Sequence, residues 1–509
     1  MDRSQDNKRI AKNTALLYVR SLILLVITLY TSRVILKALG VEDYGIYNLV
    51  GGVVTMFAMI SGTLSSASQR FITFALGEGD SGNCKKVFSN SITLHIVLGL
   101  IIVAILEIGG VWFLNHKLNI PEGRMAVANV VLQCSIATFF VNIISVPFNA
   151  LIIAHEKMSA FAYISILEGV LKLLIAIMLL YVWMDKLVLF AILQLALAVF
   201  LRSIYSIYCN RHFEEAQRLK VHIDKGLFKD MFSFAGWNLF GQTSMVLRNQ
   251  GVDIVLNMFF GVTVNAAKGV SNQVQRAVMQ FVGNFQTALK PQLTKSVAQN
   301  DIQRTHELVI QGSRFSFYMM LLFTVPLIIS SKEILGLWLV KVPDWASVFV
   351  QLTMFYLLLD TQSRFLLHAI MATGKIRNYQ IVVGGTKLMA IPMAYLWLVA
   401  GGTPTVGIWV NIILEIICLG ERLYFNKKML NLPVADFLNS AFTKCFLVLI
   451  VAMLVPYLTY LYVTKDLWVV LPVSLASSLL AVYCLGLNKH ERTQLISKAE
   501  NIIRKKIHV

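Results

Sequence analysis

The sequence predicts an all-α polytopic membrane protein of about 14 transmembrane helices, arranged as two repeated six-helix lobes plus a C-terminal helix pair. Of the 509 residues, 57% are hydrophobic and only 14% are charged, whereas soluble proteins carry about a quarter charged residues. Apolar stretches of about 20 residues, the length that crosses a bilayer, recur along the chain. An internal repeat relates its two halves.

The apolar stretches set the expected helices and domains. Their centres lie near residues 26, 56, 102, 140, 172, 198, 245, 275, 322, 357, 390, 413, 450 and 475. The seventh and eighth are so polar that hydropathy alone nearly misses them. The expected parts are a first lobe, a cytoplasmic link, a second lobe, the helix pair and a basic amphipathic cytoplasmic tail, at residues 1–210, 211–228, 229–430, 431–488 and 489–509.

The repeat appears when the chain is shifted by 221 positions. Residues 36–80, which contain a predicted turn at residues 40–45 and a helix that ends near residue 80, then align without a gap on residues 257–301, with seven identities in 45 positions. Farther along, residues 154–157 correspond to residues 372–375. Two similar halves in one membrane protein suggest a transporter with its binding site between them.

Basic residues predict the orientation. Every second connection between the helices is rich in Lys and Arg, and the connections between these are poor in both. Because cytoplasmic loops carry the excess of Lys and Arg, we expect both termini in the cytoplasm. The net charge of +18 is thereby placed at a membrane surface, which argues against a nucleic-acid partner.

Polar stripes on the membrane helices indicate an interior, hydrated cavity. A charged side chain at mid-membrane costs about 2.5–3.5 kcal/mol on the insertion scale, so several such residues must face protein or water. The expected polar lining consists of Asn48, Thr55, Gln69, Asn249 and Asn272. The cations expected to contact the substrate are Arg248, Lys268, Arg276, Arg364 and Arg33.

The acidic residues leave two interpretations open. Asp253, Glu415 and Asp360 are candidates for a coupling-ion site. However, Asp360 lies four residues before Arg364 and could simply neutralise it, and Glu415 could be a partner for Arg422. Glu168 and Lys172 have the same i,i+4 spacing, and there we favour a structural pair.

The excess of cations makes the expected cavity positive, which suits an anionic substrate and in particular a phosphate, because arginine binds phosphate through two parallel hydrogen bonds. The sequence has no GxxxxGK[ST] motif, no pattern of catalytic residues, and only short outside loops. The cysteines are scattered without CxxC pairs. We therefore expect a protein that is not an enzyme and that uses no metal or cofactor.

Three segments resemble a known family. These are Lys12-Asn-Thr, the run from Thr31 to Tyr47 with its Gly40-Val-Glu-Asp-Tyr-Gly45 turn, and Ser68-Gln-Arg-Phe71. They resemble the polysaccharide (O-antigen, capsule and exopolysaccharide) flippases of the multidrug/oligosaccharidyl-lipid/polysaccharide (MOP) exporter superfamily. The resemblance is strongest over about the first 80 residues, and the expected 6+6+2 helix layout extends it over the chain.

The resemblance implies a location in the bacterial inner membrane and movement of an undecaprenyl-diphosphate-linked oligosaccharide from the inner to the outer leaflet. Polysaccharide polymerase and assembly proteins are then possible partners besides membrane lipids. Two alternatives remain: a cation-coupled multidrug exporter of the same superfamily, which needs acidic groups in its cavity, and a non-transporting scaffold for glycan assembly. A scaffold leaves the buried charges unexplained.

The predicted topology can be tested by single-cysteine labelling from the periplasmic side in a cysteine-free background. Cysteines at positions 43 and 403 should react, and a cysteine at position 220 should not, because the basic link is expected in the cytoplasm. Labelling at 220 but not at 43 would reverse the orientation and, with it, the direction of transport.

Overall fold

The computed structural model describes residues 3–55, 57–117, 120–217, 224–339, 342–489 and 491–493, and this part of the chain contains helices and no strand. The predicted all-α class is confirmed. The chain divides into two compact units. Unit 1 comprises Met1–Gln242, Thr287–Asp301 and Met371–Arg377, and unit 2 comprises Thr243–Gln286, Ile302–Ile370 and Asn378–Val509. The lobe boundaries expected from the sequence remain a prediction.

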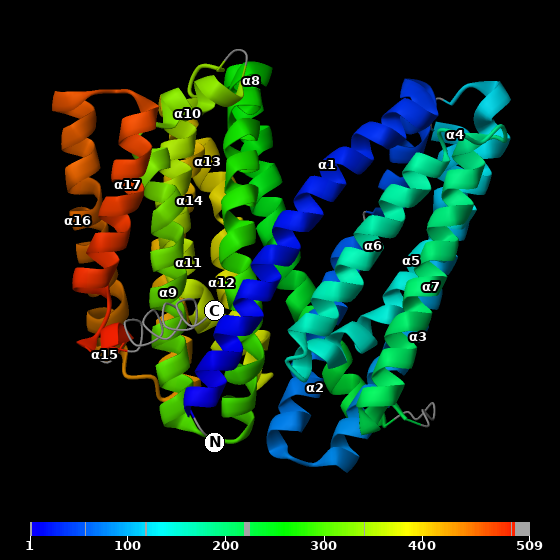
Figure 1. The fold of residues 1–509 in the computed structure, drawn as a ribbon, viewed down its shortest axis with the longest axis horizontal. Helices are drawn as coiled ribbons and strands as arrows, with labels where there is room; N and C mark the ends of the chain where they lie inside the picture. Colours follow the sequence, from blue (N-terminus) through cyan, green and yellow to red (C-terminus); the bar gives the residue numbers. More distant parts are fainter. Residues whose placement is uncertain are drawn as a thin grey trace, which may run out of the picture. The chain divides into compact units, whose positions relative to one another are not determined.

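Unit 1 is a bundle built from the first helices of the chain (Figure 1). Within it α5 lies against α7, α2 and α3, and α1 lies against α6. Both ends of the long helix α8 also belong to this unit. Its helices are α1 (Arg3–Thr55), α2 (Ala58–Glu78), α3 (Ser81–Ile105), α4 (Val111–Lys117), α5 (Met125–Ala154), α6 (Met158–Met178), α7 (Lys186–His212) and the ends of α8 (Lys225–Ala298).

Unit 2 contains the middle of α8 and the later helices. In this unit α9 packs against α16 and α17, which also pack against each other, and α13 packs against α14. The helices are α9 (Ile302–Ile329), α10 (Ser331–Trp338), α11 (Ala346–Thr373), α12 (Arg377–Leu388), α13 (Ala390–Val399), α14 (Val406–Leu430), α15 (Val434–Phe437), α16 (Lys444–Leu458) and α17 (Leu467–Ala481).

Nine helical segments in the described residues are long and apolar enough to cross a membrane. Helices also occupy the five other expected positions, in residues 41–78, 225–260, 262–298, 346–373 and 406–430, but they do not meet this criterion of length and composition. The total of about 14 spans therefore stays a prediction. The expected amphipathic tail lies outside the described residues from position 494 onward.

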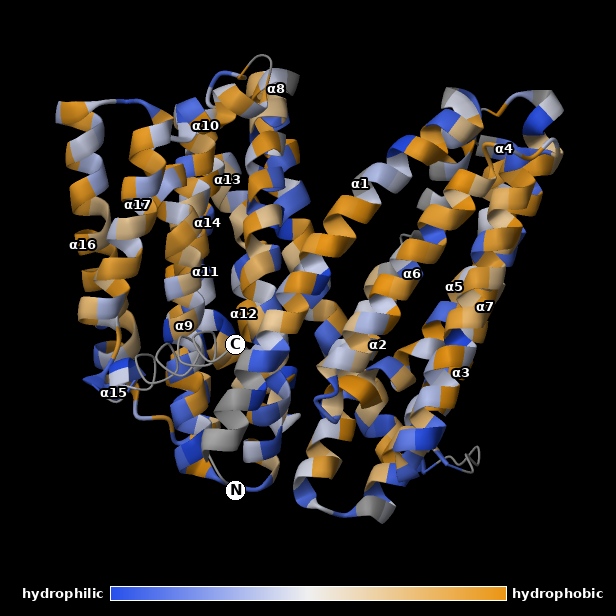
Figure 2. Ribbon diagram, in the orientation of Figure 1, coloured by the Kyte–Doolittle hydropathy of each residue, from blue (hydrophilic) through white to orange (hydrophobic). Residues whose placement is uncertain are grey.

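Large apolar side chains cover the outer faces of the helices. Leu100 on α3, Leu454 on α16 and Leu480 on α17 are more than half exposed. Figure 2 shows hydrophobic residues along the lengths of the helices and hydrophilic residues gathered toward many of their ends. Such surfaces are stable in contact with lipid but not with water.

The internal repeat appears in the backbone conformation. Gly40 and Gly261, which are 221 positions apart, have φ values of 78° and 71° and kink α1 and α8. Gly79 and Asn300 have the same spacing and both have positive φ, at 78° and 54°. The sequence predicts a turn over residues 40–45, but the structure has a kink at Gly40 alone. A single residue with positive φ is enough to redirect a helix, and glycine adopts this conformation without a steric cost.

Each end of unit 1 is held by an ionic cluster. Arg124 forms ion pairs with Asp43 and Asp185, which joins three connections that the charge pattern predicts on one side of the membrane. At the other end Glu156, in the connection between α5 and α6, pairs with Arg9 and Lys295, both at 2.8 Å. We call these last three residues the Glu156 cluster.

Repeat-related residues touch each other next to the Glu156 cluster. Lys290 donates a hydrogen bond of 3.3 Å to Gln69, 221 positions earlier. Gly77 and Ala298 are related by the same shift, and a Cβ placed on Gly77 would lie 2.8 Å from the Cβ of Ala298. The ends of α2 and α8 therefore meet at repeat-related positions, and Gly77 permits the close contact.

We expect Gly77→Ala to lower the thermal unfolding temperature of the detergent-purified protein. The added methyl group would also lie 3.0 Å from the Lys295 Cα, a backbone atom that cannot move without shifting α8, and such overpacking typically costs about 1–3 kcal/mol.

Gly62→Ala is the matched control, because Gly62 lies on the same helix and has nothing within 4 Å of an added Cβ. Its unfolding temperature should be unchanged or higher, since alanine favours a helix over glycine by roughly 0.5–1 kcal/mol. Equal behaviour of the two variants would contradict the close contact at Gly77.

Candidate functional site

A buried carboxylate and a buried arginine form the centre of the polar interior of unit 2. Arg422 Nη1 lies 2.5 Å from Glu415 Oε1 on the same helix, α14, and the two side chains are only 2% and 1% exposed. Ser363 on α11 donates to Glu415 at 2.9 Å, and Arg422 Nε donates to the Tyr379 hydroxyl on α12 at 3.2 Å. Glu415 is thus the partner of Arg422, which was one of its two predicted roles.

The second predicted pair is also present. Arg364 Nη2 lies 2.5 Å from Asp360 Oδ2, one helical turn away on α11. Asp360 is buried, whereas Arg364 keeps about a quarter of its side-chain surface exposed. Each carboxylate therefore neutralises an arginine, and this pairing meets the requirement that buried charges be compensated.

Arg248 on α8 is buried but only partly satisfied. Its Nη2 donates to the Tyr356 hydroxyl on α11 at 2.9 Å, and its residue exposure is 2%. Among the described residues no hydrogen-bond partner reaches its Nε or Nη1. Glu415 and Asp360 act on it through their charges but make no hydrogen bond with it. Two N–H groups of a buried cation are thus available to a ligand or to water.

Lys268 and Asp253 form a second charged group on α8, on opposite sides of the Gly261 kink. Lys268 is buried and is influenced by the charges of Asp253 and Arg248. The Asn272 side chain is hydrogen-bonded to Asp253. The structure therefore brings together four of the predicted site residues, namely Arg248, Asp253, Lys268 and Asn272.

Arg276 lies two helical turns beyond Lys268 and is exposed, as is Asn249. We find no ion pair of Arg276 within the described part of the chain. Of the two acids that could have paired with it, Asp360 forms an ion pair with Arg364, and Asp253 lies within the electrostatic influence of Lys268. Arg276 is thus not explained as one half of a structural ion pair.

The remaining predicted residues belong to unit 1. Arg33 on α1 is exposed, and Gln69 accepts the hydrogen bond from Lys290 described above. Asn48 and Thr55 lie on α1, where the structure describes their backbone but not their side chains. We therefore make no statement about a site that combines these residues with those of unit 2.

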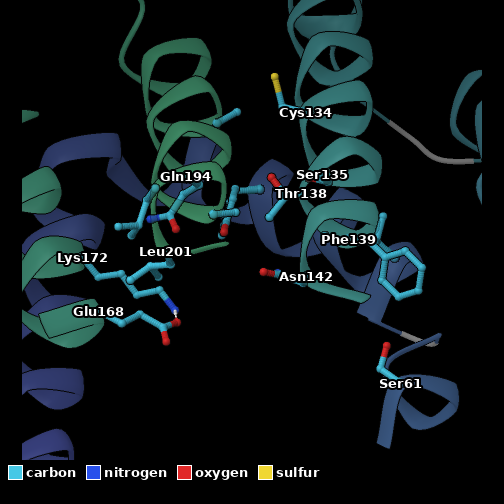
Figure 3. Close-up of a pocket in the computed structure, with 16 residues that line it drawn as sticks. Ser61, Cys134, Ser135, Thr138, Phe139, Asn142, Glu168, Lys172, Gln194 and Leu201 are labelled. Atoms are coloured by element: carbon cyan, nitrogen blue, oxygen red, sulfur yellow. Dashed lines mark hydrogen bonds and ion pairs between the residues drawn. The ribbon is translucent and has the colours of Figure 1, made fainter. Parts of the chain in front are cut away.

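Unit 1 also contains a cavity of about 500 Å³ between α1, α2, α5, α6 and α7, shown in Figure 3. Asn142 and Gln194 point into it, toward the ion pair in which Lys172 Nζ lies 2.6 Å from Glu168 Oε1. The predicted Glu168–Lys172 pair is confirmed, but it lines a cavity. A smaller space of about 150 Å³ shares part of this lining and extends to Arg202.

Sequence reasoning missed three cations. Lys387 on α12 lies within the electrostatic influence of Arg422, Glu415 and Arg248. Arg20 on α1 and Arg202 on α7 stack over the rings of Phe161 and Phe148, at 4.5 and 3.8 Å from the ring centroids. All three interrupt apolar stretches of the sequence, and this signal could have identified them. They lie outside the polar stripes on which the prediction depended.

The first part of the chain matches a described protein family. Residues 10–297, more than half of the chain, match the family described as "Polysaccharide biosynthesis protein". The chain is 20% identical over 278 residues to EpsK of Bacillus subtilis (strain 168), described as an uncharacterized membrane protein. This match covers 54% of the chain and 55% of EpsK, so it spans about half the length of that relative.

Solved structures of transporters share the fold. A MATE structure in the bent conformation superposes with a TM-score of 0.71 at 13% identity, over 86% of this chain and 97% of its own. A MOP superfamily transporter from Pyrococcus furiosus, reported to have a binding pocket of reversed polarity, superposes with a TM-score of 0.69 at 12% identity, over 85% of this chain and 96% of its own. At this level of identity these likenesses concern the fold alone.

Proposed function

Because this chain belongs to the polysaccharide biosynthesis protein family, of the flippase type within the MOP superfamily, we propose that it moves an undecaprenyl-diphosphate-linked oligosaccharide across the bacterial inner membrane. In this proposal the lipid-linked sugar enters from the inner leaflet, and alternating access of a cationic interior releases it to the outer leaflet. The coarser assignment, a membrane transporter of this superfamily, is the premise.

The observation that carries the proposal is Arg248 with its two unsatisfied N–H groups. A buried donor without a partner costs about 1–3 kcal/mol, and more when it is charged. A diphosphate oxygen would remove this cost, because charge-assisted hydrogen bonds to phosphate are among the strongest in proteins. Lys268 and Arg276 on the same helix add positive charge, and Arg276 is exposed and so accessible to a ligand.

The charge of the site also fits the direction of transport. When the inside of the membrane is negative, outward movement of negative charge is favourable by about 2.3 kcal/mol per charge for each 100 mV. A diphosphate-linked substrate would therefore be driven outward even without a coupled ion. A cationic drug would meet the opposite force and would also be repelled by Arg248, Lys268 and Arg276.

We expect Arg276→Ala to lose most of the transport of lipid-linked oligosaccharide in reconstituted vesicles, while Arg276→Lys keeps more of it. Lysine preserves the charge but not the two parallel hydrogen bonds. Loss of one charge-assisted contact, about 1.5–3 kcal/mol, corresponds to a rate or affinity lower by about tenfold or more. Arg211→Ala, at the exposed end of α7, is the matched control and should transport normally.

The double variant Arg276→Ala with Asp253→Ala separates ligand binding from structure. Removing an aspartate restores no phosphate ligand, so transport should stay lost. Recovery of transport in this double variant would contradict the proposed role, and so would normal transport in Arg276→Ala at normal levels of inserted protein.

The acidic candidates for coupling make a second prediction for the same vesicles. We expect Asp253→Asn to change the pH or sodium dependence of transport, because Asp253 is half-buried and close to the ligand-binding cations. Glu415→Gln should instead lower thermal stability, since breaking a buried ion pair typically costs about 3–5 kcal/mol.

Asp436→Asn, at an exposed position of α15, serves as the control and should change neither property. Unchanged pH and sodium dependence in the Asp253 variant would leave the membrane potential as the driving force.

A further inference from the structure

The lining of the unit 1 cavity includes two amides, hydroxyl groups and one ion pair. We propose that this cavity binds the saccharide part of the transported molecule, an inference that rests on the proposed function. A volume of about 500 Å³ lies within the range of small-molecule sites, about 300–1,000 Å³. The lining of this cavity does not include Arg248, Lys268 or Arg276, the cations of α8. The two sets of residues can therefore be tested separately.

The polar groups of the cavity suit hydroxyl groups better than phosphate alone. Asn142 and Gln194 bring amides that both donate and accept hydrogen bonds, and Thr138 adds a hydroxyl group. Figure 3 shows Asn142 on α5 and Gln194 on α7 pointing into the same space. Sugar hydroxyls likewise donate and accept, whereas a phosphate only accepts at its charged oxygens. Amides on two facing helices can therefore bind one sugar ring from two sides.

The Glu168–Lys172 pair supports the same ligand class. It presents a carboxylate acceptor and an ammonium donor 2.6 Å apart on the cavity wall, and both side chains are more than a third exposed. A carboxylate at this position disfavours a phosphate as the main ligand, because like charges repel. A hydroxyl-rich ligand can bind both members of the pair.

The smaller space beyond the pair carries donors and acceptors without partners. Among the described residues, no hydrogen bond reaches Nη1 of Arg202 or Oδ1 of Asn149, and both atoms are buried. The Arg202 guanidinium is held by its stacking on Phe148 and has no acidic partner in the described part of the chain. This smaller space thus offers one unpaired donor and one unpaired acceptor, which a sugar hydroxyl can satisfy together because it both accepts and donates.

A natural cysteine allows the proposal to be tested in the intact protein. Cys134 lines the cavity, and Cys484 is exposed on the helical segment Val482–Gly486 of unit 2, outside the cavity. The full-length protein in lipid nanodiscs would be treated with N-ethylmaleimide, and the alkylation rates of both cysteines measured by mass spectrometry. The probes are undecaprenyl-diphosphate-linked oligosaccharide extracted from the host and undecaprenyl diphosphate without sugar, each at saturation.

We expect the glycan-bearing lipid to slow alkylation of Cys134 by about tenfold, and undecaprenyl diphosphate to leave it unchanged, while Cys484 reacts at one rate throughout. The double variant Asn142→Ala with Gln194→Ala should lose this protection. It should bind the glycan-bearing lipid about tenfold more weakly and undecaprenyl diphosphate as before. Asn129→Ala on the same helix, outside the cavity, should behave like the wild type.

The outcomes separate this inference from the proposed function. Binding of both lipids without protection of Cys134 overturns the saccharide site and leaves the flippase proposal intact. Protection by undecaprenyl diphosphate alone assigns the cavity to the lipid phosphate and also overturns the inference. Failure of the wild type to bind either lipid overturns the proposed function, and this inference with it.

Discussion

The architecture of unit 1 depends on one buried carboxylate. The Glu156 side chain is 1% exposed. It forms ion pairs with Arg9, at the start of α1, and with Lys295, at the end of α8, and it accepts a hydrogen bond from Gln292 on α8. An ionised carboxylate removed from water is stable only when it is paired and hydrogen-bonded, so these segments must meet wherever the connection between α5 and α6 places Glu156. The backbone contributes as well, because Asn13 donates to the Glu156 carbonyl at 3.2 Å.

Two pairs of repeat-related residues touch each other, and both pairs consist of different residues. Where a residue touches its own counterpart, the two must be complementary rather than alike. Two lysines at positions 69 and 290 would repel each other, and glutamine with lysine forms a hydrogen bond. Alanines at both 77 and 298 would place two methyl groups 2.8 Å apart, and glycine with alanine does not. Sequence divergence at these two pairs of positions is therefore a condition of the contacts between them.

The predictable features of the fold were those that follow from apolar stretches of bilayer length, from the Lys and Arg residues in alternate connections, and from the internal repeat. The glycines at positions 40 and 261 were identified by the repeat, and their equal backbone conformation confirms their correspondence. The i,i+4 pairs were predictable because they lie on a single helix. Contacts between helices were not: nothing in the sequence indicates that Arg248 meets Tyr356, or that Glu168 and Lys172 face a cavity. Such contacts depend on how helices rotate against each other, and a hydropathy pattern does not fix that rotation.

The degree to which each buried cation is satisfied separates structural from ligand-binding residues. Arg422 has its carboxylate, a tyrosine and a serine around it, so a ligand would have to compete with partners that are already optimal. Arg248 and Arg202 keep buried N–H groups that no partner in the described part of the chain reaches, and a ligand that accepts these hydrogen bonds would remove the resulting free-energy cost. A transporter needs this intermediate state, because its site must attract the substrate and also release it. On the proposed function, Arg248 is therefore the ligand-binding arginine of unit 2, and Arg202 lines the space next to the proposed saccharide cavity of unit 1. The fully paired Arg422 maintains the scaffold in which Arg248 is held.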